Sequence, residues 1–500
     1  MTTIGRTFYP VQTSMEQIGR MQDRFAALQK QLATGQKASN LAEMGSTRYF
    51  SLSVRARANR ISGYGESIDM VNLRLDAFNQ VTTSLEKVAQ AARTAITPSA
   101  FGSSAFSYGT VPSLARANLD QMVDLLNTDV NGRYLFSGAK TDQKPVQGTS
   151  AILDGAGGKA GFAQVAAERQ QADVGDGLGR LTLTAATDTV TLTEDGTHPF
   201  GFKLSTVTST GSAPVTLTQP NGTAPQSASI QLTGVPIAGQ TVSVGLTLPD
   251  GSSDTVTLTA VTGTPGAGEF QIGADVNTTA ANLKTAIQSS LTTEGGTTLA
   301  AASNNAAANN FFNAQGQQVM RVPGPNFATA TSLVVADPTT TVIWYQGGND
   351  TNARASVQAK VDDNQTVSYG AQANEMGTLQ MMRSFAVLAV QNFTTSDPTS
   401  EGRYDAIASR NADRMSPIQS GQQGSLELLA VELSNTKVAM ADISTRHDAY
   451  VEQLNSMVSK VETVPDEQTA AELLALQTRL QASYQATSMI SQLSLVNYIK

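Results

Sequence analysis

The sequence of 500 residues contains no cysteine, which excludes disulfide bonds, thiolate metal sites and a cysteine nucleophile. Histidine is nearly absent too: His198 and His447 are the only two, so imidazole catalysis has little material. Basic residues are sparse, with 33 Lys and Arg against 41 Asp and Glu and a net charge of -8. Because they form no basic stripe, nothing attracts a polyanion, and nucleic acid is not an expected partner.

Long apolar runs are also missing. No run approaches the length that crosses a membrane, and residues 1–10 lack the apolar core of a cleaved signal peptide. We therefore expect no membrane as a partner. The chain is longer than one hydrophobic core usually accommodates, so its length predicts two to four domains.

Residues 11–133 have a helical pattern in which apolar residues recur at alternating steps of three and four. Such steps predict the a/d seam of a coiled coil. The first seam consists of Ile18, Met21, Phe25, Leu28 and Leu32. The second consists of Ile61, Ile68, Val71, Leu75, Phe78 and Leu85. Pro98 ends the second helix, because proline forces the preceding residue out of helical conformation.

The carboxy-terminal part mirrors this pattern. Its long seam contains Leu426, Leu429, Leu433, Met440, Ile443 and Leu454. A sustained spacing of about 3.5 residues favours a supercoiled rod over the surface helix of a globular domain. Pro465 separates this rod from a last helix, and another helix is expected at residues 375–393.

The last helix has almost no charge: between residues 473 and 499 only Arg479 is charged. A surface helix of a soluble monomer shows a charged face. We therefore favour burial of this helix by neighbouring subunits over burial in the core of a single domain. Its expected packing residues are Leu473, Leu476, Leu480, Tyr484, Ile490 and Leu493.

Between residues 148 and 348 the composition changes to Thr, Ser, Gly, Ala and Val. Short alternating runs that begin at Leu181, Val190, Val215 and Val256 predict half-buried strands. Three dipeptides predict hairpin turns: Asp195-Gly196, Asn221-Gly222 and Asp250-Gly251. Alanine-rich stretches predict a helix at residues 274–291 and a loop at residues 300–310. A β-rich part thus interrupts the helical one, and the two helical ends must pair across it.

Few residues suggest chemistry. His447 occupies a seam position, where a packed histidine is expected rather than a metal ligand. Asn349-Asp350 and Asp362-Asp363 resemble fragments of a calcium site, but each fits a turn equally well, and turns are the default. With no triad or nucleotide motif, we expect no catalytic residues, no metal, no cofactor and no enzymatic activity.

Specific strings resemble the bacterial flagellin superfamily. Residues 131–142, Asn-Gly-Arg-Tyr-Leu-Phe-Ser-Gly-Ala-Lys-Thr-Asp, are similar to the segment that ends the amino-terminal helical core in flagellins and hook-to-filament junction proteins. The family motif residues are Asn131, Gly132, Arg133, Tyr134, Leu135, Phe136 and Gly138. Residues 31–35 resemble the element that closes the first helix, residues 342–347 the strand that returns to the core, and residues 491–498 the junction-protein terminus.

The resemblance implies an α+β fold in which long terminal α-helices form a coiled-coil or helical-bundle core and a β-rich outer domain is inserted. The expected divisions are an export signal and polymerisation helix at 1–40, core halves at 41–147 and 341–462, an outer domain at 148–340 and a polymerisation helix at 463–500. The implied location is the extracellular flagellum, reached by type III export. The implied partners are copies of the chain, flagellin, hook-associated proteins and an export chaperone.

Two departures bear on the choice within the superfamily. Residues 38–45 lack the paired acidic residues that many flagellins carry after the first helix, and the chain ends Tyr-Ile-Lys rather than Leu-Leu-Arg or Leu-Leu-Gln. The ending favours the junction protein over the filament flagellin, which stays the alternative. A secreted adhesin, with the Thr-rich strands as its binding part, is a more distant alternative.

The two seams give a direct test. Leu28→Asp and Leu433→Asp each place a charge among apolar residues. An unpaired buried charge costs about 3–5 kcal/mol, which is most of the stability of a domain. We expect both variants to lose motility in a soft-agar swimming assay. Near-normal swimming by either would show that its seam faces water.

Overall fold

The computed structural model describes residues 9–96, 108–313, 317–415 and 424–498, and it has the α+β composition expected. The chain divides into two compact units. The first comprises residues 1–70, 360–366 and 438–500, and the second comprises residues 71–359 and 367–437. Helices α2 (Arg48–Ala95) and α10 (Leu426–Glu462) contribute residues to both units.

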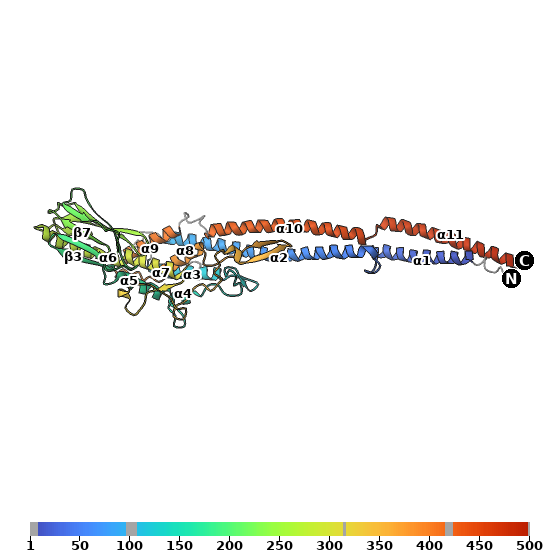
Figure 1. The fold of residues 1–500 in the computed structure, drawn as a ribbon, viewed down its shortest axis with the longest axis horizontal. Coiled ribbons are helices and arrows are strands. Elements are labelled where there is room, and N and C mark those ends of the chain that lie inside the picture. The colour runs from blue at the N-terminus through green and yellow to red at the C-terminus, as the bar shows by residue number, and fades with distance from the viewer. Residues whose placement is uncertain (1–8, 97–107, 314–316, 416–423, 499–500) are drawn as a thin grey trace. The chain divides into compact units, whose positions relative to one another are not determined.

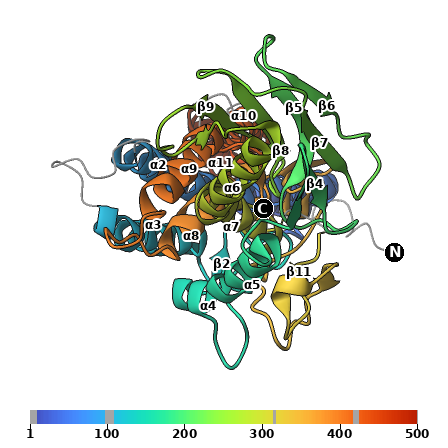
Figure 2. The ribbon, with the colours of Figure 1, turned by 90° about the vertical axis from the view of Figure 1, so that its left-hand side faces the viewer.

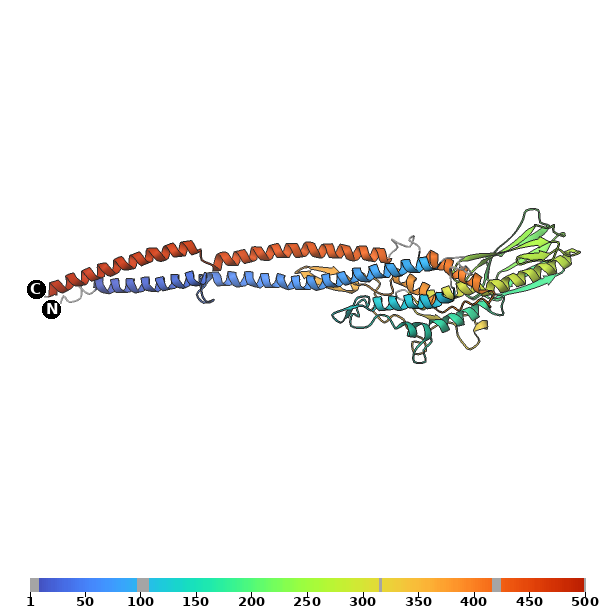
Figure 3. The same ribbon diagram turned by 180° about the vertical axis from the view of Figure 1, so that it is seen from behind.

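In the first unit, α1 (Tyr9–Thr34) and α11 (Asp466–Tyr498) lie side by side (Figure 1). They run antiparallel, so the two described chain ends lie at the same end of the pair (Figure 3). The break between α10 and α11 lies at residues 463–465, where Pro465 predicts it. Farther along the unit, α2 packs on α10 through Val54, Ala58, Ile61, Leu454 and Val458.

Gly35 ends α1 with the left-handed backbone that glycine adopts at little cost, φ +66°, and its N–H donates to Gln31 O at 2.8 Å. The chain then joins the α10–α11 break: Lys37 N–H donates to Glu462 O at 2.7 Å, and Val464 N–H donates to Gly35 O at 3.1 Å. These two backbone bonds fix the point from which α1 and α11 extend together.

In the second unit, α3 (Val111–Leu126) packs on α8 (Met376–Ala389). Leu119, Met122 and Leu126 line the buried face of α3. Helix α8 confirms the helix expected at residues 375–393 and is buried along most of its length. Helix α2 ends at Ala95, and Pro98 lies outside the described residues.

Four more helices lie between residues 148 and 340 (Figure 2). They are α4 (Thr149–Asp154), α5 (Phe162–Val174), α6 (Val276–Gly296) and α7 (Thr298–Phe311). Helix α6 confirms the expected helix, whereas the loop expected at residues 300–310 is wrong, because this stretch is α7. Its alanines let it pack closely on α5 and α9 (Ser400–Arg414), and this burial outweighs the weak helix propensity of its asparagines.

The β-rich part is two four-stranded sheets. In order across it, the first sheet is β3 (Leu181–Ala186), β4 (Thr189–Glu194), β7 (Ser227–Leu232) and β6 (Val215–Thr218). The second is β10 (Glu269–Gln271), β9 (Ser253–Val261), β8 (Thr241–Thr247) and β5 (Lys203–Ser209). All four expected runs are strands. Their apolar faces and α6 share one core, which includes Val190, Ile230, Val244, Leu258 and Leu283.

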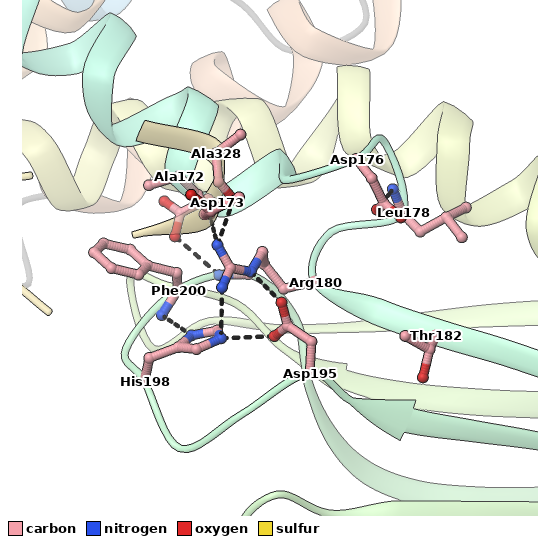
Figure 4. Close-up of polar contacts among 12 residues, drawn as sticks. Ala172, Asp173, Asp176, Leu178, Arg180, Thr182, Asp195, His198, Phe200 and Ala328 are labelled. Carbon is pink, nitrogen blue, oxygen red and sulfur yellow. Dashed lines mark hydrogen bonds and ion pairs between the residues drawn. The ribbon is translucent and has the colours of Figure 1, made fainter. Parts of the chain in front are cut away.

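Asp195-Gly196 does not form the hairpin turn that the sequence suggests, because β4 and β5 belong to different sheets. The connection between them is held by a buried polar cluster (Figure 4). Arg180 Nε donates to Asp195 Oδ2 at 2.5 Å, and His198 Nε2 lies 2.6 Å from Asp195 Oδ1. Both side chains that meet Asp195 are buried. The connection from one sheet to the other is thus fixed by contacts between side chains. A dipeptide motif does not reveal such contacts.

The remaining strands are short. They are β1 (Asp129–Val130), β2 (Arg133–Tyr134), β11 (Met320–Arg321), β12 (Val334–Val335), β13 (Gln358–Asp362) and β14 (Gln365–Ser368). Asp363 and Asn364 form the turn between β13 and β14, as expected. The strand expected at residues 342–347 is wrong: this stretch makes single bridges to Val146 and, at Thr341, to Ala160. Because Val146 and Ala160 lie on two different segments, no continuous strand pairing forms.

Two side chains join the sheets where β5 lies next to β6 and β7. Glu194 accepts hydrogen bonds from the N–H groups of Leu204 (3.0 Å) and Gln226 (3.2 Å). Gln219 Oε1 accepts from Val207 N–H at 2.9 Å, and its amide donates to the carbonyl of Val207. The side chains take the place of a strand pairing and leave the edge of β5 satisfied.

We expect Glu194→Ala to open this join, because two backbone N–H groups lose their acceptor at a cost of roughly 1–3 kcal/mol each. Hydrogen exchange measures it: the Leu204 and Gln226 amides should exchange at least about tenfold faster. Asp188, which lies in the turn between β3 and β4, is the control when changed to Asn and should leave both amides protected. Unchanged exchange in Glu194→Ala would show that Glu194 does not hold the sheets together.

Candidate assembly surface

The α1–α11 pair has a small apolar interface. Leu28, Leu476 and Leu480 are its buried residues. Four of the other predicted seam residues pack against them while partly buried: Ile18, Met21, Phe25 and Leu473. The structure therefore brings these residues of the first and last predicted seams together. The interface is a narrow stripe along two long helices.

Other predicted residues of the same helices face outward. The exposed fractions are 38% for Leu32, 47% for Tyr484 and 45% for Ile490. Met15, Leu474 and Met489 are more exposed still, at 62% each. The side chain of Leu493 lies outside the described residues. Large apolar side chains thus occupy several faces of the pair, where a monomer in water gains nothing from them.

Charged side chains are scarce on α11. After Arg479, α11 has no charged residue to its end at Tyr498. One ion pair links the helices, Arg24 to Glu472 at 3.7 Å, and both side chains are largely exposed. Such a pair contributes little to stability. Helix α11 is therefore apolar or uncharged over its terminal half, whereas α1 carries the exposed Glu16, Arg20 and Asp23.

A second group of exposed apolar residues follows α1. It consists of Leu41 (50%), Tyr49 (83%), Phe50 (40%) and Leu52 (45%), in the loop at residues 36–47 and the first turns of α2. Leu41 and other residues of the loop, together with Arg55 and residues 460–462, line a hollow of about 640 Å³. The sequence reasoning missed these residues, because they follow no seam. Four large apolar residues within twelve positions, flanking a loop, are the signal available.

The base of this hollow is held by Glu462. Arg55 Nε donates to Glu462 Oε1 at 3.0 Å, and the hydroxyl of Ser51 bonds the same oxygen. The hydrogen bonds from Arg55 and then Ser51 hold the pKa of Glu462 below its usual value. These side-chain bonds join the start of α2 to the end of α10, and the loop is tied to the same point by Lys37 N–H, which donates to Glu462 O.

The predicted core seams are buried throughout. Those of α2 are Ile61, Ile68, Val71, Leu75, Phe78 and Leu85. Those of α10 are Leu426, Leu429, Leu433, Met440, Ile443 and Leu454. His447 is buried as well, with Nε2 3.4 Å from Asp362 Oδ2. In the described ranges, no three His, Asp or Glu side chains gather as a metal site.

The family motif forms a tight connection in the second unit. Asn131 (φ +54°) and Gly132 (φ +73°) make the two-residue turn between β1 and β2. Arg133 and Tyr134 form β2, and Leu135 is buried. These residues place the following segment, which carries the inward-facing part of the motif.

Phe136 is fully buried, and its ring meets Phe78 edge-on at 5.3 Å. Gly348 N–H donates to Ser137 O at 2.7 Å, and Gly138 N–H donates to Ala371 O at 2.9 Å. The motif therefore joins two segments that lie far away in the sequence. We name this meeting point the return node, residues 136–138, 345–350 and 371–375.

Residues 6–141 match the family model of the bacterial flagellin N-terminal helical region. The match spans α1, α2, α3 and the β1–β2 turn, and it supports the bacterial flagellin superfamily, whose members are structural rather than enzymatic. No curated protein matches the sequence significantly. Among the described helices, none is long and apolar enough to cross a membrane.

The exposed residues of α11 give a test. Replacing Leu474, Met489 and Ile490 together with Ser should leave the helix content of the single chain unchanged, because these side chains contact water there. Burial of such side chains contributes about 1.5–3 kcal/mol each, so we expect the critical concentration for assembly to rise at least about tenfold.

Pelleting of polymer by ultracentrifugation measures this concentration. Ile237→Ser is the matched control: Ile237 is 69% exposed but lies between β7 and β8, and assembly should be unchanged. Equal pelleting of the triple variant and the control would show that these α11 residues do not contact neighbouring subunits.

Proposed function

We propose that the chain is a structural subunit of the bacterial flagellum that polymerises through α1 and α11 and catalyses no reaction. The observation that carries this proposal is the exposed apolar surface of the α1–α11 pair. A helix that lacks a partner for its apolar face is marginal in water, so neighbouring subunits are the expected cover. The flagellin match supports the same role.

The proposed partners are copies of this chain and the other flagellar axial proteins, among them flagellin and hook-associated proteins. The proposed route is type III export, assisted by an export chaperone, to the outside of the cell. Residues 1–40 and 463–500 serve as the polymerisation elements. The residues from 148 to 340 form the outer part, and its Thr-rich strands lie far from the polymerisation helices in sequence.

Within the flagellum, we place the subunit at the junction of hook and filament. The support is the resemblance of residues 491–498 to the junction-protein terminus. At a junction, few copies are needed and each must match a different neighbour on either side. A filament flagellin instead must add to itself without limit. The length of the polymer formed by the chain alone therefore separates the two roles.

Electron microscopy of cells that lack the gene tests the proposal. We expect cells with hooks but no attached filaments, and purified chain that forms only short assemblies. Long filaments grown from the purified chain alone would assign it to the filament instead. Normal filaments on the deletion cells, with lost surface attachment, would contradict assembly and favour an adhesin.

A further inference from the structure

The return node contains two buried oxygen atoms that accept no hydrogen bond. One is Oδ2 of Asp350, and the other is Oδ1 of Asn374, whose residue is only 4% exposed. A buried acceptor without a partner costs roughly 1–3 kcal/mol, and more when it is charged. Such atoms in a structure call for a ligand, an ion or an ordered water.

The two oxygens lie on segments that are fastened to each other. Gln372 Nε2 donates to Asp350 O at 3.1 Å, and Asn374 Nδ2 donates to Asn349 Oδ1 at 3.1 Å. The amide of Asn374 thus faces the segment at 349–350. Further oxygens line the same segments, among them the side-chain oxygen of Asn349 and the carbonyls of Gly348 and Asp350. All of these oxygen atoms are hard ligands, the kind that calcium prefers.

Gly348 leaves room for the side chain of Asp350. A Cβ atom on Gly348 would lie 3.2 Å from Asp350 Oδ2 and 2.9 Å from Ala139 N, so only glycine lets the carboxylate approach the motif this closely. Tyr345 closes another side, and its hydroxyl donates to Gly348 O at 2.8 Å. Burial, followed by the charges of Glu375 and Asp350, raises the pKa of Tyr345, which keeps the phenol protonated as a donor.

No protein cation neutralises Asp350 in the described part of the chain. Arg354, four residues after Asp350 in the chain, is already paired with Glu375 and with Glu432. The other acidic turn of the sequence differs: Asp362 and Asp363 have Arg446, His447 and Arg60 as ion-pair partners. The return node therefore has an excess negative charge, and the turn at 362–363 does not.

We propose that the return node binds a calcium ion, with the side-chain oxygens of Asp350 and Asn374 among its ligands. One carboxylate with amide and carbonyl oxygens is a weakly charged donor set, so the affinity belongs to the range of extracellular modules, about 0.1–1 mM. The ion ties the motif to the segments at 345–350 and 371–375. It thereby stabilises the point at which the two halves of the second unit join.

The fluorescence of Trp344 can report calcium binding. Trp344 is the only tryptophan of the chain, it is fully buried, and its ring lies 5.6 Å from that of Tyr345. Titration of the full-length chain, freed of metal with a chelator, should change the Trp344 emission saturably with calcium. Terbium should show luminescence sensitised by Trp344 and Tyr345, and excess calcium should quench it. Neither signal depends on assembly, so the flagellar role is not under test.

Asp350→Asn keeps the size of the side chain and removes its charge, and we expect it to raise the calcium dissociation constant at least tenfold. Asn374→Ala should act in the same direction. Asp363→Asn is the matched control and should bind as the unaltered chain does. No emission change and no terbium signal in the unaltered chain up to 10 mM calcium, roughly tenfold above the expected range, would overturn the proposal. Equal affinity in Asp350→Asn would overturn it too, and would assign the orphan oxygens to ordered water.

Discussion

One feature of the α1–α11 pair governs the rest of the structure: the pair buries too few apolar residues for the length of its helices. Three leucines form its core, while several larger side chains on the same helices face water. Elsewhere, the seam residues of α2 and α10 are buried, so the shortage is specific to the terminal pair. Because α11 has no charged residue after Arg479, water compensates little for the missing contacts on that helix. We propose that association with other subunits covers these residues.

The second constraint is that the chain must leave its helical part and return to it. The return node meets this need with backbone hydrogen bonds from the motif at 136–138 to residues 348 and 371–373. Phe136 anchors the node on α2 through Phe78. In the segment between these two points, α7 packs on α8 and α9, and α5 packs on α7, so this segment is not separate from the helices of the second unit. The node and not the sheets therefore defines how the two halves meet.

Local patterns revealed most of the fold. The three–four spacing predicted α1, α2 and α10, Pro465 predicted the break before the last helix, and two-residue alternation predicted four strands. Features that depend on distant contacts were not predictable. Helix α7 forms from asparagine-rich sequence because its alanines are buried, and the stretch at 342–347 bridges to two separate segments instead of joining one strand. For the site, spacing identified Leu28, and the lack of charge on the last helix identified Leu476 and Leu480. Neither pattern identified the exposed Leu41, Tyr49 and Phe50, because exposed residues need not recur at a regular spacing.

Limited proteolysis followed by mass measurement tests the central claim most directly, applied to the single chain and to the assembled form. If α1 and α11 depend on neighbouring subunits, the single chain should lose about 35 residues from each end within the time that leaves the rest intact. The assembled form should resist the same treatment, and the trimmed chain should no longer assemble. A single chain whose ends resist cleavage as well as its core would contradict the account.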